Sequence, residues 1–240
     1  MEYFQTDDAQ IYADIAYRLG RIVEQYECFY LQLAPEERFN STLYLSILQI
    51  LLTICEEHLN QLKTNSRHED FAKSLNDLAL TNWGVDEKCW IKNTFKEEKN
   101  LENFITRLRN SVSHPTKTTL DSDTPSTGYT AVKDSAGNIK SFCFINSPDV
   151  KNNQRKYYKK DSFENLVKYR YSFCQDGIEF KEDSGDKGYL YLNGKPYIRL
   201  SIIKLDVHQL KQFVKALANY MAQPIQKNWS GFEIVNLLAK

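Results

Sequence analysis

Residues 101–115 read LENFITRLRNSVSHP, and this stretch decides how the rest of the chain is interpreted. Its apolar side chains recur at intervals of three and four residues, as on one face of an α-helix; they are Leu101, Phe104, Ile105, Leu108 and Val112. At roughly 100° per residue, the other side of the helix carries Asn103, Thr106, Arg107, Asn110, Ser113 and His114. The pattern predicts a helix over 99–114 that buries its apolar stripe and exposes its polar side.

Three polar residues near the end of this helix are suited to handling a phosphodiester. Arg109 supplies a permanent planar cation that matches phosphate oxygens, and His114 can take or give a proton near neutral pH. Asn110 and His114 share one helix face, with Arg109 on the flank between that face and the core. Because Pro115 cannot continue the helix, we expect His114 to cap it. The alternative is that Arg109 and His114 are ordinary solvated cations at a helix C-terminus.

The residues before this helix show further helical patterns. Residues 8–33 carry apolar side chains at alternating spacings of four and three, namely Ile15, Leu19, Ile22, Tyr26, Phe29 and Leu33. A second helix is expected from an N-cap at 40–42 to about residue 63. Weaker helical patterns cover 68–80 and 86–98, and the acidic residues of 86–100 are interpreted as the exposed side of a helix. These segments predict a four- or five-helix bundle.

The periodicity changes after Pro115, where a Thr-, Ser- and Asp-rich loop begins. Short β-prone segments follow, at 129–133, 139–145, 169–174, 178–181, 189–192 and 197–203. A last helix is expected at 206–221 under an Asp206 cap. We therefore expect a mainly α fold: a helical core at 1–115, a β-containing insertion at 116–205, and a C-terminal helical segment at 206–240 that returns to the bundle.

The order Arg-Asn-x-x-x-His, on a helix that follows two long helices, resembles the signature of the HEPN superfamily, helical domains of which many are ribonucleases. The resemblance covers roughly residues 8–115. It looks most similar to plasmid-borne and defence-associated HEPN proteins, whose motif is likewise followed by His-Pro and then by a Ser-Thr-Gly-aromatic stretch, here PSTGYT at 125–130.

This resemblance implies a metal-independent endoribonuclease without a cofactor, acting as a toxin or an anti-phage defence effector. His114 would move a proton at the 2′-hydroxyl or the leaving 5′-oxygen, Arg109 would neutralise the phosphorane, and Asn110 would orient the phosphate or His114. The resemblance also implies 2′,3′-cyclic phosphate and 5′-hydroxyl products and a homodimer that pairs two motifs. The alternative is a non-catalytic HEPN module that binds a nucleotide, an RNA or a protein partner. A third possibility is a toxin held in check by an antitoxin or other regulatory partner.

A second candidate RNA-binding segment, KNNQRKYYKK, spans residues 151–160. Cations that follow a phosphate backbone alternate there with rings on which bases can stack. With Arg107 on the motif helix, the candidate RNA contacts are Lys151, Arg155, Lys156, Tyr157, Tyr158, Lys159 and Lys160. The alternative is a solvated loop followed by a strand whose tyrosines face the core.

The composition limits the class of protein. Lys plus Arg equals Asp plus Glu, at 31 each, so RNA binding would need a local patch rather than overall charge. The 5 cysteines include no C-x-x-C pair, which argues against a disulfide framework and a zinc site. The N-terminal residues lack the features of a signal peptide, and no apolar stretch reaches the ~20 residues of a spanning helix. We therefore expect a soluble, cytoplasmic protein with reduced, mainly buried thiols.

Overall fold

The computed structural model describes residues 8–33, 40–62, 69–79, 82–95, 97–113, 126–148, 150–151, 154–155, 158–161, 164 and 178–226. The chain forms two compact units. The first unit comprises Met1–His68 and Leu210–Lys240, and the second comprises Glu69–Gln209. The division expected after residues 115 and 205 stays a prediction.

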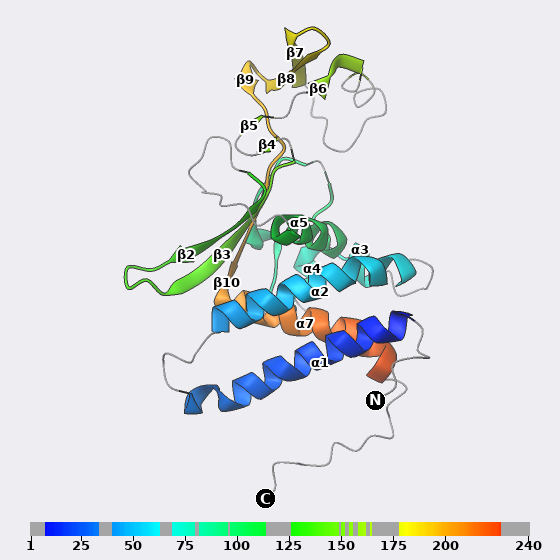
Figure 1. Cartoon of the computed structure of the whole chain (residues 1–240), viewed down its shortest axis with the longest axis vertical. Coiled ribbons are helices and arrows are strands. Elements are labelled where there is room, and N and C mark those ends of the chain that lie inside the picture. The colour runs from blue at the N-terminus through cyan, green and yellow to red at the C-terminus, as the bar shows by residue number, and fades with distance from the viewer. Residues whose placement is uncertain are drawn as a thin grey trace, which may run out of the picture. The chain divides into compact units, whose positions relative to one another are not determined.

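The first unit is helical, as the sequence predicts. It contains α1 (Asp8–Phe29), the short 3-10 helix η1 (Tyr30–Gln32), α2 (Asn40–Leu62) and the residues of α7 (Val207–Gln226) from Leu210 onward. Figure 1 shows α1, α2 and α7 as neighbouring helices of this unit. Glu27 of α1 links all three, because its carboxylate contacts Lys211 Nζ at 3.0 Å and Lys215 Nζ at 3.1 Å and accepts a hydrogen bond from the Tyr44 hydroxyl at 3.4 Å.

The inward face of α1 differs from the predicted stripe. Its buried side chains are Ala13, Ala16, Leu19 and Val23, whereas Ile22 and Phe29 are exposed. Gly20 lies beside α7, since a Cβ at Gly20 would lie 3.5 Å from Ala218 Cβ. Of the four buried residues, only Leu19 belongs to the predicted stripe.

The second unit is built on a four-stranded antiparallel sheet in the order β1-β10-β3-β2. The strands are β1 (Trp90–Asn93), β2 (Gly128–Lys133), β3 (Ile139–Asn146) and β10 (Ser201–Asp206). The motif helix α5 (Leu101–Ser113) packs against β3 and β2. Its Phe104 ring meets the indole of Trp90 edge-on at 5.9 Å between centroids. The helix and the sheet thus share one core.

The predicted hairpin at 129–145 is confirmed. Asp134 Oδ1 accepts the backbone N–H groups of Ala136 and Asn138, each at 2.9 Å, and so closes the turn between β2 and β3. An Asx-type turn of this kind is why Asp followed by small residues favours the hairpin.

A smaller antiparallel sheet has the order β6-β8-β7, with β9 paired to β8. Its strands are β6 (Tyr158–Lys159), β7 (Ile178–Ser184), β8 (Lys187–Leu192) and β9 (Lys195–Pro196), and β4 (Val150–Lys151) pairs with β5 (Gln154–Arg155) separately. Asn193 and Gly194 have φ values of 51° and 75° at the turn between β8 and β9, the left-handed pair that a two-residue hairpin requires. The strand predicted at 169–174 lies outside the described residues.

The expectation of a mainly α fold with a β-containing insertion is wrong. Of the described residues, 52% are helical and 29% are strand, in an arrangement with two antiparallel sheets. Strand β1 precedes the motif helix and pairs with β10, so the main sheet is not inserted after that helix. The helix expected at 68–80 is only α3 (Glu69–Ala72) and α4 (Leu75–Ala79), and that expected at 86–98 is the 3-10 helix η4 (Glu87–Cys89) followed by β1.

The reason for this error lies in the side chains at 90–94. Trp90 is buried and donates its indole N–H to Ser201 Oγ at 2.7 Å, while the next residue, Ile91, is exposed. Lys92 is exposed as well, and the pairing with β10 is irregular between Trp90 and Lys92, so these four residues show no regular two-residue period that the sequence could reveal. Pairing with β10, more than a hundred residues away, decides the conformation.

Candidate functional site

The motif helix starts and packs as its sequence predicts. Asn100 caps it by accepting the Asn103 backbone N–H at 2.9 Å, and the Asn103 amide donates to the Glu98 carbonyl at 2.9 Å. The predicted apolar stripe is confirmed as buried, from Leu101 to Val112. Ser111 is buried as well, and its hydroxyl donates to the Arg107 carbonyl at 2.8 Å.

Arg109 and Asn110 lie beside the buried stripe and are both half-buried. At roughly 100° per residue, they point in clearly different directions from the helix axis. Asn110 shares a face with Arg107, one turn earlier, as residues three apart do. His114, with the cap expected from it, lies outside the described residues.

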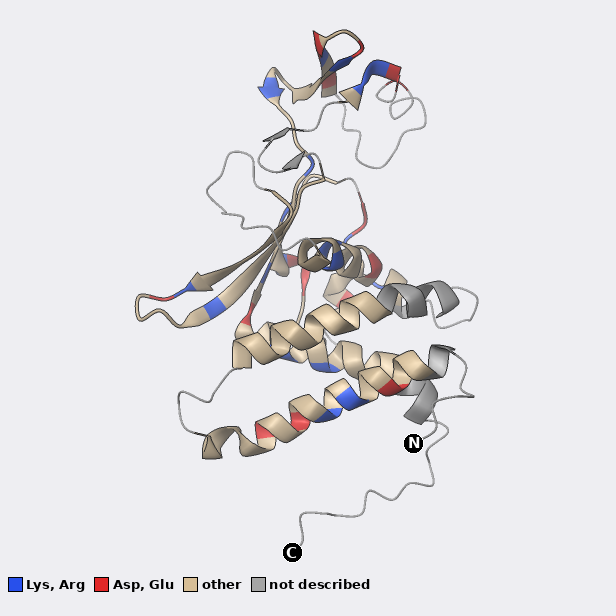
Figure 2. Ribbon diagram, in the orientation of Figure 1, with Lys and Arg blue, Asp and Glu red and all other residues tan. Residues whose placement is uncertain are grey.

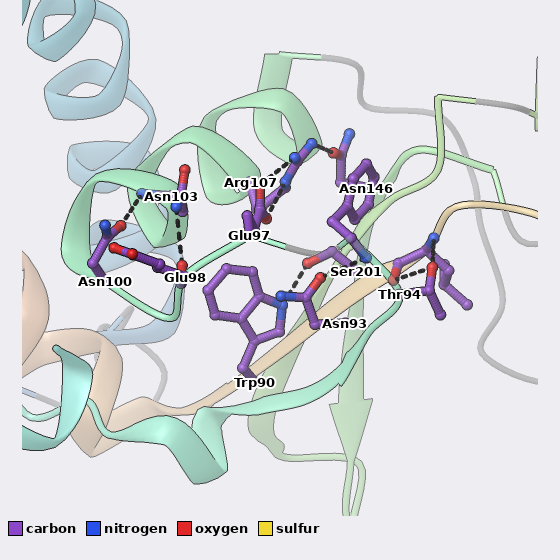
Figure 3. Close-up of polar contacts among 12 residues, drawn as sticks. Trp90, Asn93, Thr94, Glu97, Glu98, Asn100, Asn103, Arg107, Asn146 and Ser201 are labelled. Carbon is purple, nitrogen blue, oxygen red and sulfur yellow. Dashed lines mark hydrogen bonds and ion pairs between the residues drawn. The ribbon is translucent and has the colours of Figure 1, made fainter. Parts of the chain in front are cut away.

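Arg107 is held in a cluster of four side chains, which we call the Arg107 clasp: Phe95, Glu97, Arg107 and Asn146. Figure 3 shows Glu97 and Asn146 beside Arg107. Arg107 Nε and Nη2 donate to the two carboxylate oxygens of Glu97 at 2.7 and 2.5 Å, and Nη1 donates to Asn146 Oδ1 at 2.9 Å. The guanidinium carbon lies 3.6 Å from the centroid of the Phe95 ring. Only 15% of the Arg107 side chain and 10% of the Glu97 side chain are exposed. Since each guanidinium nitrogen is engaged, Arg107 anchors the motif helix.

A second set of contacts anchors the segment that leads into the motif helix. Three hydrogen bonds join Thr94 and Leu200. The Thr94 N–H and hydroxyl donate to the Leu200 carbonyl at 2.9 and 3.3 Å, and the Leu200 N–H donates to Thr94 Oγ1 at 2.7 Å. The Tyr197 hydroxyl donates to the Thr94 carbonyl at 3.1 Å. Figure 3 shows Thr94 and Glu97 on the connection between β1 and α5. This connection is therefore held by Leu200 and Tyr197 near β1 and by Arg107 of α5 further along.

Sequence reasoning missed Glu97 as a site-forming residue. The acidic residues of 86–100 were interpreted as a solvated helix side, and that interpretation is wrong for Glu97, which pairs with Arg107 ten residues later. Helical and strand periodicities predict contacts only within one helix or strand, so neither predicts a contact between a loop residue and a helix residue ten positions later. The one sequence feature that could have indicated this pair is Phe95-x-Glu97, which lies shortly before a helix that carries Arg107 in addition to Arg109.

The second candidate segment is divided by the structure. Tyr158 is buried with Leu190 and Tyr197 in the core of the small sheet, and its hydroxyl accepts from Arg199 Nη2 at 3.3 Å. Lys159 is exposed, and Lys160 Nζ pairs with Glu182 Oε1 at 2.8 Å. Figure 2 shows acidic and basic positions mixed along β6, β7 and β8.

The remaining members of that segment have limited descriptions. Lys151 and Arg155 belong to strands β4 and β5, without described side chains, and Lys156 and Tyr157 lie outside the described residues. The structure thus assigns Tyr158 to a core and does not bring this segment together with the motif helix in any described contact.

Within the described ranges, the structure gives the environment of three cysteine thiols. Cys28 is exposed, whereas Cys89 and Cys143 are buried. Burial raises the pKa of Cys89 to about 11, which keeps this thiol neutral near pH 7. Within these same ranges, the His, Cys, Asp and Glu side chains form no group of three or more that could hold a metal ion. None of the described helices is both long enough and apolar enough to cross a membrane.

The sequence Arg-Asn-x-x-x-His, which begins on a capped helix and follows two long helices in the chain, is the pattern expected of a HEPN-type protein. The profile of the family described as HEPN pEK499 p136 matches residues 1–178, and the chain belongs to this family. No curated protein and no solved structure matches the chain significantly. The matched region includes α1, α2, the motif helix and the β2–β3 hairpin, and it ends before β10 and α7. Family membership indicates a nucleotide-related or RNase-type function.

Proposed function

We propose that the protein is a metal-independent endoribonuclease that acts as a toxin or an anti-phage defence effector. The observation that supports this most is the position of Arg109 and Asn110. In a chain of the HEPN family, both lie off the buried stripe of a helix that is fixed at its start and along its length. A reactive group must be held within a fraction of an ångström to be effective, and a clamped helix provides such a support.

The proposed reaction is an internal transfer at phosphorus. One His114 removes the proton from the 2′-hydroxyl, the 2′-oxygen bonds to phosphorus, and the bond from phosphorus to the 5′-oxygen breaks. The leaving 5′-oxygen takes a proton from a second His114, and Arg109 compensates the charge on the phosphorane. Asn110 orients the phosphate or His114. The products are a 2′,3′-cyclic phosphate and a 5′-hydroxyl.

Substrate RNA is proposed to contact the basic segment. The proposed contacts are Lys151, Arg155, Lys156, Tyr157, Lys159 and Lys160. Arg107 and Tyr158 are not among them, because the guanidinium is bonded to Glu97 and Asn146 and the phenol lies in a core.

The proposed function predicts that the purified protein cleaves single-stranded RNA in the presence of EDTA. Mass spectrometry of the fragments should find a 2′,3′-cyclic phosphate on one end and a 5′-hydroxyl on the other, because the attacking oxygen is internal. A matched oligonucleotide with a single 2′-deoxy residue at the cleaved position should stay intact. Cleavage that requires a divalent metal, or that continues at the deoxy position, would refute this mechanism. Binding of RNA without cleavage would favour the non-catalytic module.

One chain supplies one His114, whereas the reaction uses an acid and a base, so the proposal also predicts a homodimer. Sedimentation at micromolar concentration should give about twice the 28.1 kDa of one chain. Mixing wild type with an excess of His114→Ala chains tests whether the sites are shared, since a mixed dimer keeps only one of the two His114 side chains that the reaction uses and should lose cleavage. A protein that cleaves RNA while sedimenting as a monomer would contradict the shared site.

A further inference from the structure

A cavity of about 360 Å³ lies in the second unit, away from the motif helix. Its walls come from four elements: η4, β1, β3 and β10, with the first turn of α7 beside them. The charged lining residues are Asp86, Lys88, Lys140, Lys204 and Asp206. Three lysines from three separate elements therefore surround one hollow.

The register of the sheet separates this cavity from the Arg107 clasp. Asp206 of β10 pairs with Ser141 at one end of β3, whereas Ser201 pairs with Asn146 at the other end. Five residues of extended strand span about 17 Å. Lys204 and Asp206 also lie on the face opposite to Ile203 and Leu205, whose side chains are buried. The cavity is thus a second location, distinct from the motif.

The two carboxylates of the cavity are already used by the backbone. Asp86 Oδ1 accepts the N–H groups of Lys88 at 2.8 Å and Cys89 at 3.2 Å, and Asp206 Oδ1 accepts the Gln209 N–H at 2.7 Å. The amide of Gln209 is tied as well, since it donates to Cys89 Sγ at 3.4 Å and accepts from the Asp206 N–H at 3.0 Å. These groups build the wall, and the thiol adds no charge because burial keeps its pKa high.

The three ammonium groups are in a different situation. Within the described ranges, neither Lys88 nor Lys140 nor Lys204 forms an ion pair with a carboxylate. Three lysines face two capped aspartates in a chain with no net charge, so the lining is locally positive. The ammonium group of lysine binds phosphate oxygens as a point charge, and several ammonium groups can bind the oxygens of one phosphate together. The side chain of Ile91, 57% exposed, adds an apolar surface at the same cavity.

We propose that this cavity binds a phosphate group, carried by a free nucleotide or by an RNA strand, through Lys88, Lys140 and Lys204. The volume is near the lower end of small-ligand sites, roughly 300–1,000 Å³, which fits one nucleotide unit with its sugar or base against Ile91. For an RNA strand the inference rests on the proposed function, because the strand would be the substrate. For a free nucleotide it stands by itself.

The test compares two triple variants of the full chain. The cavity variant changes Lys88, Lys140 and Lys204 to Ala, and the control variant changes Lys92, Lys133 and Lys187, three exposed lysines of the same unit that do not line the cavity. A third variant places Arg at the three cavity positions and keeps the charge. Calorimetric titration uses AMP, and a labelled oligouridylate is titrated at several salt concentrations.

The cavity variant should bind the preferred ligand at least about tenfold more weakly than wild type, because each charge-assisted hydrogen bond contributes about that factor. The control and the arginine variant should stay within about threefold of wild type. Loss of AMP binding in the cavity variant identifies a free nucleotide as the ligand of the cavity. If the cavity variant instead binds the oligouridylate more weakly, the ligand is an RNA strand. The slope of log affinity against log salt concentration should then be smaller by up to about 2, because each of three lost phosphate contacts contributes roughly 0.7 to that slope.

Equal losses in the cavity and control variants, for both ligands, would overturn the inference, as would wild-type binding in the cavity variant. The outcome is separable from the nuclease proposal. If wild type does not cleave RNA, but only the cavity variant loses AMP binding, the phosphate site is supported and the endoribonuclease proposal is rejected. If wild type cleaves RNA, and the cavity variant binds both ligands and cleaves RNA like the control variant, the endoribonuclease proposal is supported and the phosphate site is rejected.

Discussion

Replacing His114 by alanine is expected to lower the single-turnover rate of RNA cleavage by ~10²- to 10⁴-fold, the usual contribution of general acid–base catalysis. Arg109→Ala is expected to cost ~10²- to 10³-fold, because it removes a cation placed where charge develops in the transition state. Both losses should appear at saturating RNA, since neither residue is proposed to supply most of the binding energy. Quenched-flow or gel assays in EDTA measure these rates directly.

Two matched substitutions serve as controls for the motif variants. His208 is exposed on α7, and Arg21 forms an exposed pair with Glu24 on α1. His208→Ala and Arg21→Ala remove the same side-chain types elsewhere and should cleave at the wild-type rate. Thermal melting of all four variants establishes that each is folded. If His114→Ala retains the wild-type rate, His114 neither donates nor accepts the proton and the proposed chemistry fails.

Replacing Glu97 by glutamine is expected to lower the free energy of unfolding by about 3 kcal/mol, because it leaves the buried Arg107 guanidinium without its counter-charge. The expected size follows from burial: 15% of the Arg107 side chain and 10% of the Glu97 side chain are exposed. Urea unfolding followed by tryptophan fluorescence should show a lower midpoint with an unchanged slope. Trp83 and Trp90 report on the unit that contains the clasp.

The same substitution at Glu87 provides the control. Glu87 pairs with Lys99 at 3.3 Å in the same unit, but the two side chains are 37% and 40% exposed. Exposed pairs contribute less than about 1 kcal/mol, so Glu87→Gln should shift the midpoint little. The Glu97 variant should also cleave RNA more slowly than the Glu87 variant, because Asn110 lies one turn beyond Arg107 on the same face. Equal midpoints for the two variants would show that the clasp does not stabilise the unit.

Local patterns predicted the elements whose causes are local. The stripe from Leu101 to Val112 predicted the buried face of α5, and the Asp134 turn predicted the β2–β3 hairpin. The capping role of Asp206 is confirmed by its contact with the Gln209 N–H at 2.7 Å. Each of these features depends on side chains within four residues of one another, where spacing and backbone geometry carry the information.

Where the predicted secondary structure is wrong, contacts between residues far apart in the sequence determine the conformation. The segment 86–98 has apolar residues at a helical spacing, yet Trp90 and Thr94 bond to Ser201 and Leu200 and hold it as strand β1 and a connecting loop. A helix that short contributes little stability by itself, so tertiary pairing prevails. The buried face of α1 also differs from the predicted stripe, because it includes Ala13 and Ala16 whereas Ile22 and Phe29 are exposed.

By itself the sequence determined the HEPN resemblance, the identity of the motif residues and the helix that presents them, because these depend on residue types at fixed short spacings. Only the tertiary structure decided that a sheet shares the core of the motif helix and that Arg107 is bonded to Glu97 and Asn146. It also decided that three lysines from η4, β3 and β10 line one cavity. The physical reason is that contacts across tens or hundreds of residues follow from chain topology, which no local period records.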